Sequence, residues 1–144
     1  MEKLIDQLKT ILGTNFALYF KAHSYHWNVE GSNFPEYHDF LGNLYNSIFL
    51  QTDDIAEHLR RLDSYAPVSL SRMMELSDIE EDVNILAPIV MFTNLFRDNE
   101  RYIIHLRAGI VAADAANEPA ISNFLQEILG KHQKHAWMLR SIIK

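Results

Sequence analysis

The sequence predicts an all-α fold, a four-helix bundle with one long crossover. Apolar residues recur at three- and four-residue steps over four long segments, as on the buried face of amphipathic helices. No stretch alternates apolar and polar residues at period two, so strands are not expected. Short links join the first segment to the second and the third to the fourth, whereas about 20 residues join the second to the third. The 144 residues suit a single domain, residues 1–144.

The first two helices form a hairpin. The first is expected from about Glu2 to Val29 and carries its apolar stripe at Leu4, Ile5, Leu8, Ile11, Leu12, Phe16 and Tyr19. Gly31–Asn33 interrupts it. The second helix opens near Phe34, with Asn33 as its cap and Pro35 in its first turn, and runs to about Asp63.

The remaining chain begins with its least regular part, Ser64–Val83, in which Leu70–Leu76 is expected to form a short crossing helix. A third helix begins near Asn84 or Pro88 and runs to about Ala113. The fourth starts at Asn117-Glu118-Pro119, which offers a cap and a first-turn proline, and continues to the end of the chain.

Composition excludes several classes of function. The sequence has no cysteine, which rules out disulfides, zinc–thiolate sites and thiol catalysis. No run approaches the ~20 apolar residues of a membrane span. The first residues lack the features of a secretory signal, so a cytoplasmic setting is the default expectation. The net charge of −6 argues against a basic nucleic-acid surface.

Asp53 and Glu57 are the first candidate metal ligands. They are four residues apart, so their carboxylates lie on nearly the same helix face. Carboxylate oxygens beside histidine suit iron, manganese or zinc better than copper. The alternative is a solvated acidic face, in which Glu57 pairs with Arg60 or Arg61.

Histidines are the second set of candidates. His23 and His26 occupy the last turns of the first helix, and His38 lies early in the second helix, at the same end of the hairpin. The alternative for each is a hydrogen-bonded or solvent-facing side chain without a ligand role.

The two sets of candidates cannot meet within one chain. His38 and Asp53 belong to one continuous predicted helix, and the 15 positions between them span roughly 22 Å. A metal–ligand bond is about 2 Å long. If all four residues serve one metal, they come from two copies of the chain that meet antiparallel.

A metal centre inside the bundle is not expected. The di-iron site of many bundles needs a Glu-x-x-His pair on each of two helices. The sequence contains no such pair. Glu100 and His105 of the third helix are five apart and therefore point in different directions.

Three segments resemble the Dps family of mini-ferritins. They are His26-Trp27-Asn28-Val29-Glu30-Gly31-Ser32-Asn33-Phe34 followed by His38, then Asp53-Asp54-Ile55-Ala56-Glu57, and finally Lys134-His135-Ala136-Trp137-Met138-Leu139-Arg140-Ser141. Each segment alone is weak, but together they are specific, and the likeness covers nearly the whole chain. The resemblance implies a ferritin-like bundle that assembles into a hollow homo-dodecamer.

The resemblance also implies a ferroxidase that protects against oxidative stress. Fe²⁺ would be oxidised by hydrogen peroxide or oxygen and stored as ferric oxide. The ligands would be His26 and His38 of one chain with Asp53 and Glu57 of a two-fold-related chain. Trp27 would lie next to the site and help divert oxidising equivalents, or would simply pack in the interface.

Position 42 departs from the family pattern. Members commonly have an aspartate four residues after the second histidine, and here that residue is Gly42. Asp39 and Asn43 each follow one residue after His38 and Gly42, and because a helix turns roughly 100° per residue, their side chains point elsewhere. The alternative function is therefore a cage with an incomplete site, which binds one metal ion such as Zn²⁺ with little oxidase activity.

Two further expectations follow from the resemblance. Asp114 and Glu118 flank the turn before the last helix, near a three-fold pore that would guide Fe²⁺ inward, or are plain helix-end charges. His132 and His135 are expected on the surface. Because the net charge is −6 and no lysine-rich tail is seen, tight DNA binding is not expected, although DNA could be protected indirectly. DNA compaction is the least supported function.

Overall fold

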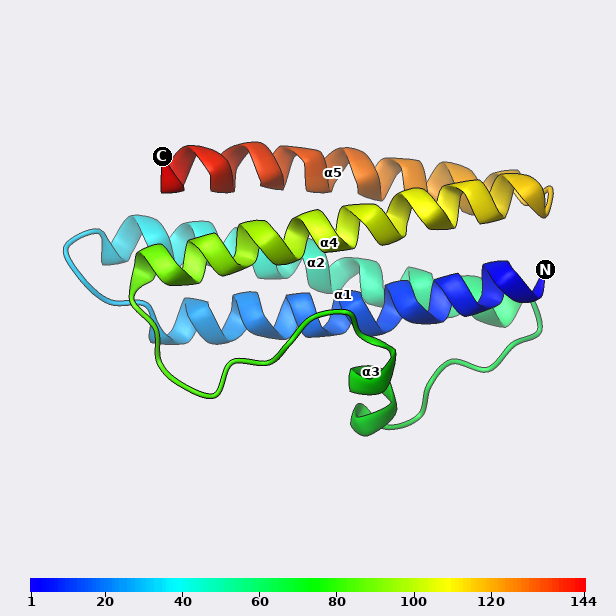
Figure 1. The fold of residues 1–144 in the computed structure, drawn as a ribbon, viewed down its shortest axis with the longest axis horizontal. Helices are drawn as coiled ribbons and strands as arrows, with labels where there is room; N and C mark the ends of the chain where they lie inside the picture. The colour runs from blue at the N-terminus through cyan, green and yellow to red at the C-terminus, as the bar shows by residue number, and fades with distance from the viewer.

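The computed structural model describes residues 1–144 as five helices without strands. They are α1 (Glu2–Asn28), α2 (Phe34–Arg61), α3 (Leu70–Leu76), α4 (Pro88–Ala115) and α5 (Pro119–Ile143). α1 and α2 form one antiparallel hairpin, and α4 and α5 form the other (Figure 1). The crossover, residues 62–87, runs along the bundle and carries α3, so that α2 and α4 are parallel (Figure 1). The predicted all-α bundle with a long crossover is confirmed.

Helix boundaries fall close to those predicted, and Asn33 is the N-cap residue of α2 as expected, but without a capping hydrogen bond from its side chain. Asn33 precedes α2 with φ −102° and ψ 22°, and its side chain accepts no backbone hydrogen bond. Its amide instead donates to the Tyr37 hydroxyl at 3.4 Å. Glu118 is the N-cap of α5 and likewise makes no side-chain cap. Asn117 has φ 57°, the left-handed conformation that ends many helices.

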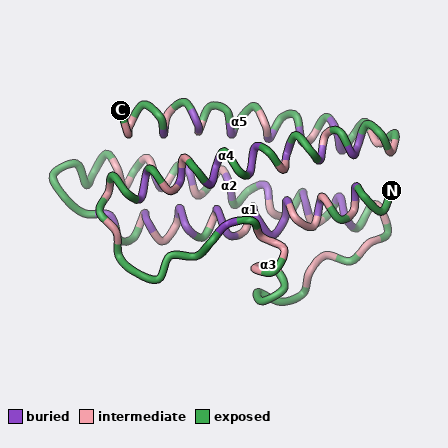
Figure 2. The backbone as a smooth tube through the Cα atoms, viewed as in Figure 1, coloured by how far each residue is buried: buried purple, intermediate pink, exposed green.

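Apolar side chains on the inner faces of the four long helices form one core. It contains 26 buried residues, of which Val29 and Ile79 lie outside the helices, and in Figure 2 the buried positions follow the inner side of each long helix. On α2 they lie at Leu41, Leu44, Ile48, Ile55 and Leu59, the three- and four-residue steps of one helix face. Each such side chain contributes about 1.5–3 kcal/mol to folding. This core fixes the helices that carry the candidate site.

The short helix α3 packs directly on the backbone of α1 at Gly13. A Cβ atom at this position would lie 2.6 Å from the Met73 carbonyl oxygen, so only glycine permits the contact. By contrast, α2 and α5 contact each other at few positions. No helix combines the length and the apolar character that crossing a membrane requires.

Candidate metal centre

His26 and His38 face each other across the α1–α2 hairpin. Their ring centroids are 3.7 Å apart, with 16° between the planes. Nδ1 of His26 lies 2.7 Å from the carbonyl oxygen of His38, and Nδ1 of His38 lies 2.8 Å from the carbonyl oxygen of His26. A carbonyl oxygen only accepts hydrogen bonds, so Nδ1 is the nitrogen that carries hydrogen in both rings. In the neutral rings, Nε2 therefore keeps its lone pair, which is the arrangement that binds a metal.

Gly42 lies against this histidine pair. It is one helical turn after His38, and a Cβ atom there would stand 3.2 Å from Cε1 of His26 and 3.4 Å from its Nδ1. Favourable contacts between carbon atoms begin near 3.5 Å. The residue that removes a ligand from the family pattern therefore also makes room for the His26 ring.

Asp53 and Glu57 lie on the solvent side of α2, together with a third carboxylate, Asp54. The three residues are exposed, and one carboxylate oxygen from each lies within 4.8 Å of the others. Glu57 Oε2 is 3.8 Å from Nη2 of Arg61, whereas Arg60 donates to a backbone carbonyl beyond the helix. An exposed pair of this kind contributes at most about 1 kcal/mol. Its weakness leaves the carboxylates available to a cation.

The histidine pair and the carboxylates are separate half-sites within one chain. The helix α2 is continuous from Phe34 to Arg61, so the 15 positions between His38 and Asp53 extend roughly 22 Å along its axis. No single metal ion bridges that distance, because its bonds are about 2 Å long.

The α1–α2 hairpin that carries the histidine pair also carries an exposed aromatic face. We use this name for Phe20, Trp27, Phe34 and Phe49, whose side chains are between 39% and 56% exposed. The Trp27 ring lies 4.2 Å from that of His23, which in turn stacks on Tyr45 with centroids 3.7 Å apart. Phe34 stacks on His38 at 5.0 Å. Several large aromatic side chains exposed on one hairpin are typical of an interaction site.

The prediction that His132 and His135 lie on the surface is wrong. His132 is fully buried, and desolvation lowers its pKa well below the usual value. Its Nδ1 lies 2.6 Å from Oδ1 of Asn99 and its Nε2 lies 2.9 Å from Nε2 of Gln51. His135 is partly buried next to Ser47, and burial, with a smaller contribution from nearby lysines, lowers its pKa to about 4.

These histidines belong to a polar network that fills the middle of the bundle. The Tyr102 hydroxyl donates to Oε1 of Gln51 at 2.9 Å, and the same oxygen accepts from Asn15 at 3.3 Å. Every buried side-chain nitrogen and oxygen has a partner. The network uses the donors and acceptors that a metal centre between the helices would need.

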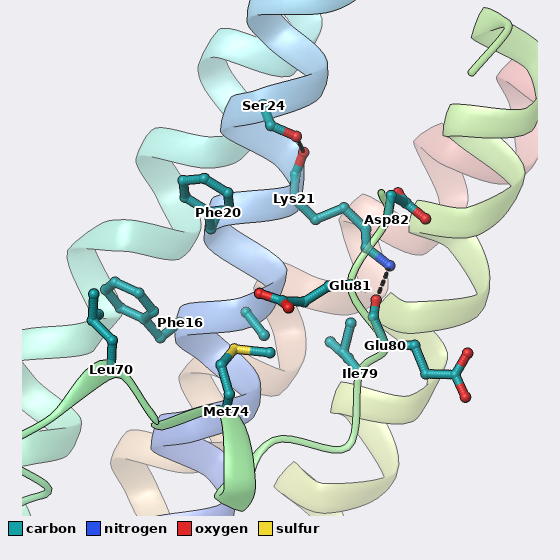
Figure 3. A pocket seen from close by; sticks show the side chains of 11 residues that line it. Phe16, Phe20, Lys21, Ser24, Leu70, Met74, Ile79, Glu80, Glu81 and Asp82 are labelled. Carbon is teal, nitrogen blue, oxygen red and sulfur yellow. Dashed lines mark hydrogen bonds between the residues drawn. The ribbon is translucent and has the colours of Figure 1, made fainter. Parts of the chain in front are cut away.

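A buried ion pair between Lys21 and Asp98 fixes α1 to α4. Lys21 Nζ lies 2.6 Å from Oδ2 of Asp98 and donates to the carbonyl oxygen of Glu80 at 2.7 Å. Figure 3 shows the second bond at one wall of a pocket of about 200 Å³ between α1, α3 and the crossover. Sequence reasoning missed this pair, although a lysine on the apolar stripe between Leu18 and Tyr25 signals it.

Other predicted candidates lie outside these half-sites. Asp114 is exposed in the last turn of α4, and Glu118 is half-exposed at the start of α5. Glu100 is exposed. Nε2 of His105 lies 2.9 Å from Oδ2 of Asp78, and Nδ1 of the same ring lies 3.2 Å from Nε2 of Gln7. The last two contacts engage both nitrogens of His105.

Comparisons with known proteins agree with this architecture. The model of the ferritin-like domain matches residues 5–144. Antigen TpF1 of Treponema pallidum is 30% identical over 142 residues, which cover 98% of this chain and 80% of the antigen. The DNA protection during starvation protein of Brevibacillus brevis is 28% identical, and the alignment covers both chains fully. The crystal structure of a Dps protein from Bacillus brevis superposes with a TM-score of 0.93 at 26% identity and covers 98% of this chain and 95% of that one.

The family match spans nearly the whole sequence, and the relatives match over the full length of the bundle rather than over one motif. The sequence matches and the superposed fold therefore agree, and the chain belongs to the ferritin-like domain family and, within it, to the Dps family of mini-ferritins.

Proposed function

We propose that the protein is an iron-sequestering mini-ferritin. In this proposal it binds Fe²⁺ at sites shared between subunits, oxidises it with hydrogen peroxide or oxygen, and stores ferric oxide inside a hollow dodecamer. Removal of iron and peroxide would protect the cell against oxidative damage and would protect DNA without binding it. The carrying observation is the stacked pair of His26 and His38, held roughly 22 Å from Asp53 on one continuous helix.

Each half-site supplies what the other lacks. The histidines offer two neutral nitrogens whose orientation is fixed by the bonds from Nδ1 to the opposite carbonyl. Asp53 and Glu57 of a second chain would bring the negative charge that holds Fe²⁺ and stabilises Fe³⁺. Two Fe²⁺ ions give one electron each, and one peroxide accepts both with two protons to form two waters.

The aromatic face supports a two-fold contact at this hairpin. An antiparallel partner that brings its Asp53 to His38 would also cover the exposed aromatic rings. Trp27 would then lie in the interface, 4.2 Å from His23, where it could donate an electron to a stray oxidant. Asp114 and Glu118 are proposed as the acidic entrance for Fe²⁺, because both are accessible to solvent at one turn of the chain.

Gly42 favours a second candidate function. It offers no carboxylate, and a side chain at this position would have to displace the His26 ring by a few tenths of an ångström. In this alternative each interface holds a single ion, with Zn²⁺ as a possible substitute for iron, and oxidation is slow. The site would then serve mainly to join subunits.

A complementation experiment tests the shared site directly. One variant carries His26→Ala and His38→Ala, and the other carries Asp53→Ala and Glu57→Ala. Neither assembly alone has a complete site. When the two chains are unfolded together and reassembled, a mixed two-fold interface has one complete and one empty site. We expect Fe²⁺ binding and peroxide-dependent oxidation to reappear only in the mixed assembly.

The controls separate assembly from chemistry. Size-exclusion chromatography of each assembly shows whether the mixture forms the same particle as the wild type. Loss of binding in both variants without recovery in a correctly assembled mixture would contradict the shared site. Stoichiometric binding with slow oxidation in the wild type would favour the single-ion alternative.

A further inference from the structure

An open groove of about 380 Å³ separates α2 from α5, where these helices make few contacts. Eight residues line it, three apolar and five polar or basic: Phe40, Asn43, Leu44, Ser47, Lys131, Lys134, His135 and Met138. It is independent of the candidate metal centre. Asn43 and Ser47 are each ten positions before Asp53 and Glu57, which places the two sets roughly 80° apart around α2.

The groove is positively charged in a chain that is negatively charged overall. Lys131 and Lys134 lie one turn apart on α5, and both are exposed. Neither takes part in any ion pair of the chain. No aspartate or glutamate lines the groove, although the sequence has 19 acidic residues and 13 basic ones. Two unpaired ammonium groups therefore face a space without a counter-charge.

Neutral donors lie on the opposite wall. Asn43 and Ser47 are one turn apart on α2 and face the groove, and Oγ of Ser47 lies 3.2 Å from Nε2 of His135. The Asn43 amide can donate to an acceptor between the helices, and the Ser47 hydroxyl can do so when Nε2 of His135 carries hydrogen and donates to Ser47 Oγ. The walls thus present donors from both helices.

Apolar side chains form the floor. Leu44 is buried, and Phe40 and Met138 are partly buried beside it. Such a surface disfavours a fully hydrated ion and favours a ligand with an apolar part. The combination of an apolar floor and a cationic rim restricts the class of ligand.

We propose that this groove binds a phosphate-type oxyanion carried on a small apolar body. Lys131 and Lys134 hold the charge through charge-assisted hydrogen bonds, Ser47 and Asn43 complete its hydrogen bonds, and the apolar body lies on Phe40 and Met138. Free inorganic phosphate shares the oxyanion chemistry but leaves the floor unused. Only a ligand with an apolar body contacts the floor, so its affinity compared with that of inorganic phosphate distinguishes the two kinds of ligand.

Isothermal titration of the metal-free assembly with inorganic phosphate and with phenyl phosphate tests the proposal. We expect one site per chain that takes both probes in competition, with phenyl phosphate bound at least about tenfold more tightly. Lys131→Gln with Lys134→Gln should weaken both by about tenfold or more. The matched control, Lys3→Gln with Lys144→Gln, removes the same charge elsewhere and should leave both affinities unchanged.

Proton NMR of His135 locates the ligand, since its ring borders the groove at Ser47. Saturable shifts of its signals with phenyl phosphate are expected in the wild type and not in the double lysine variant. Absence of binding, an equal loss in the control, or tighter binding of inorganic phosphate than of phenyl phosphate would overturn the proposal. None of these outcomes bears on the shared iron site, because no metal is present in the experiment.

Discussion

Gly42 and His26 are in contact across the α1–α2 hairpin, and a Cβ atom at position 42 would stand 3.2 Å from Cε1 of the histidine. The same imidazole stacks on His38, one turn earlier on α2. The ring of His26 is thus held between a glycine backbone and a second imidazole. A side chain at position 42 has to displace this ring by a few tenths of an ångström while it brings a new functional group to the site.

Gly42→Asp tests whether the missing carboxylate limits oxidation. We expect the added carboxylate to border the His26–His38 pair and to increase the Fe²⁺ bound per interface. Oxidation by peroxide should then be several-fold faster than in the wild type. Anaerobic titration followed by stopped-flow absorbance measures both quantities.

Gly42→Ala is the matched control, because its Cβ crowds His26 in the same way without adding a ligand. Alanine gains about 1 kcal/mol of helix propensity, which the crowding offsets. We expect Fe²⁺ affinity in this variant to be equal to or weaker than that of the wild type. An aspartate variant no faster than the alanine variant would show that position 42 does not border a second metal position.

Sequence periodicity predicted the bundle because its signals are local. Apolar steps of three and four residues and the turn residues between them sufficed to place every helix, including α3 at Leu70–Leu76. The separation of His38 from Asp53 also followed from the sequence, since helix rise alone sets it. The approach of the two histidines was only suggested by their place at one end of the hairpin.

Features that depend on the packing of several helices were missed. His132 was expected on the surface, yet Asn99 and Gln51 from two other helices satisfy both of its nitrogens. The ion pair between Lys21 and Asp98 likewise joins residues 77 positions apart. No local pattern contains such pairings.

Acid is expected to destabilise the protein through His135. Burial lowers the pKa of His135 to about 4 in the folded chain, whereas an unfolded histidine titrates near 6.5. Between these values the unfolded state binds more protons, so the free energy of unfolding falls as pH falls, by up to about 1.4 kcal/mol per pH unit. His132, with its pKa also lowered by burial, adds to the loss.

Urea unfolding of the metal-free protein at several pH values between 7 and about 4.5, at one protein concentration, measures this dependence. In His135→Gln, the slope of the free energy of unfolding against pH should be smaller than in the wild type, by at most the contribution of one bound proton. An unchanged slope would show that His135 does not carry the effect.

Loss of the Lys21–Asp98 pair is expected to be costly. Both side chains are almost fully buried, and Lys21 also donates to the crossover at Glu80. Lys21→Met leaves Asp98 inside the bundle with only Arg97 nearby, and removal of one partner of a buried pair costs about 3–5 kcal/mol. Denaturant midpoints measure the loss.

The matched variant is Lys21→Met with Asp98→Leu, which removes both charges. Because no charge is then left uncompensated in the interior, we expect it to be more stable than Lys21→Met alone. Asp98→Leu alone completes the comparison, and a double variant whose loss equals the sum of the losses in Lys21→Met and Asp98→Leu would mean that the charges do not interact.

Asn46 should lie beside its own copy at the two-fold interface. If Asp53 of one chain meets His38 of another, the two-fold axis that relates the chains passes α2 midway between positions 38 and 53, at residue 45 or 46. Asn46 is exposed and precedes Asp53 by seven positions, so it faces the same side of α2 to within roughly 20°. Cα atoms lie about 2.3 Å from the axis of their helix, so two helices packed about 8–10 Å apart bring facing Cα atoms to about 3.4–5.4 Å.

The upper part of that range overlaps the range of a disulfide, for which Cα atoms lie about 4.4–6.8 Å apart. The chain has no cysteine, so Asn46→Cys introduces the only thiol. We expect mild oxidation to convert this variant to a covalent dimer on non-reducing gels, without metal and with the assembly intact. Ser47→Cys is the control, since it sits at the same height on α2 but is turned by roughly 100° toward α5. A dimer from Ser47→Cys and none from Asn46→Cys would place the axis elsewhere, and His26 would then have no carboxylate partner at Asp53.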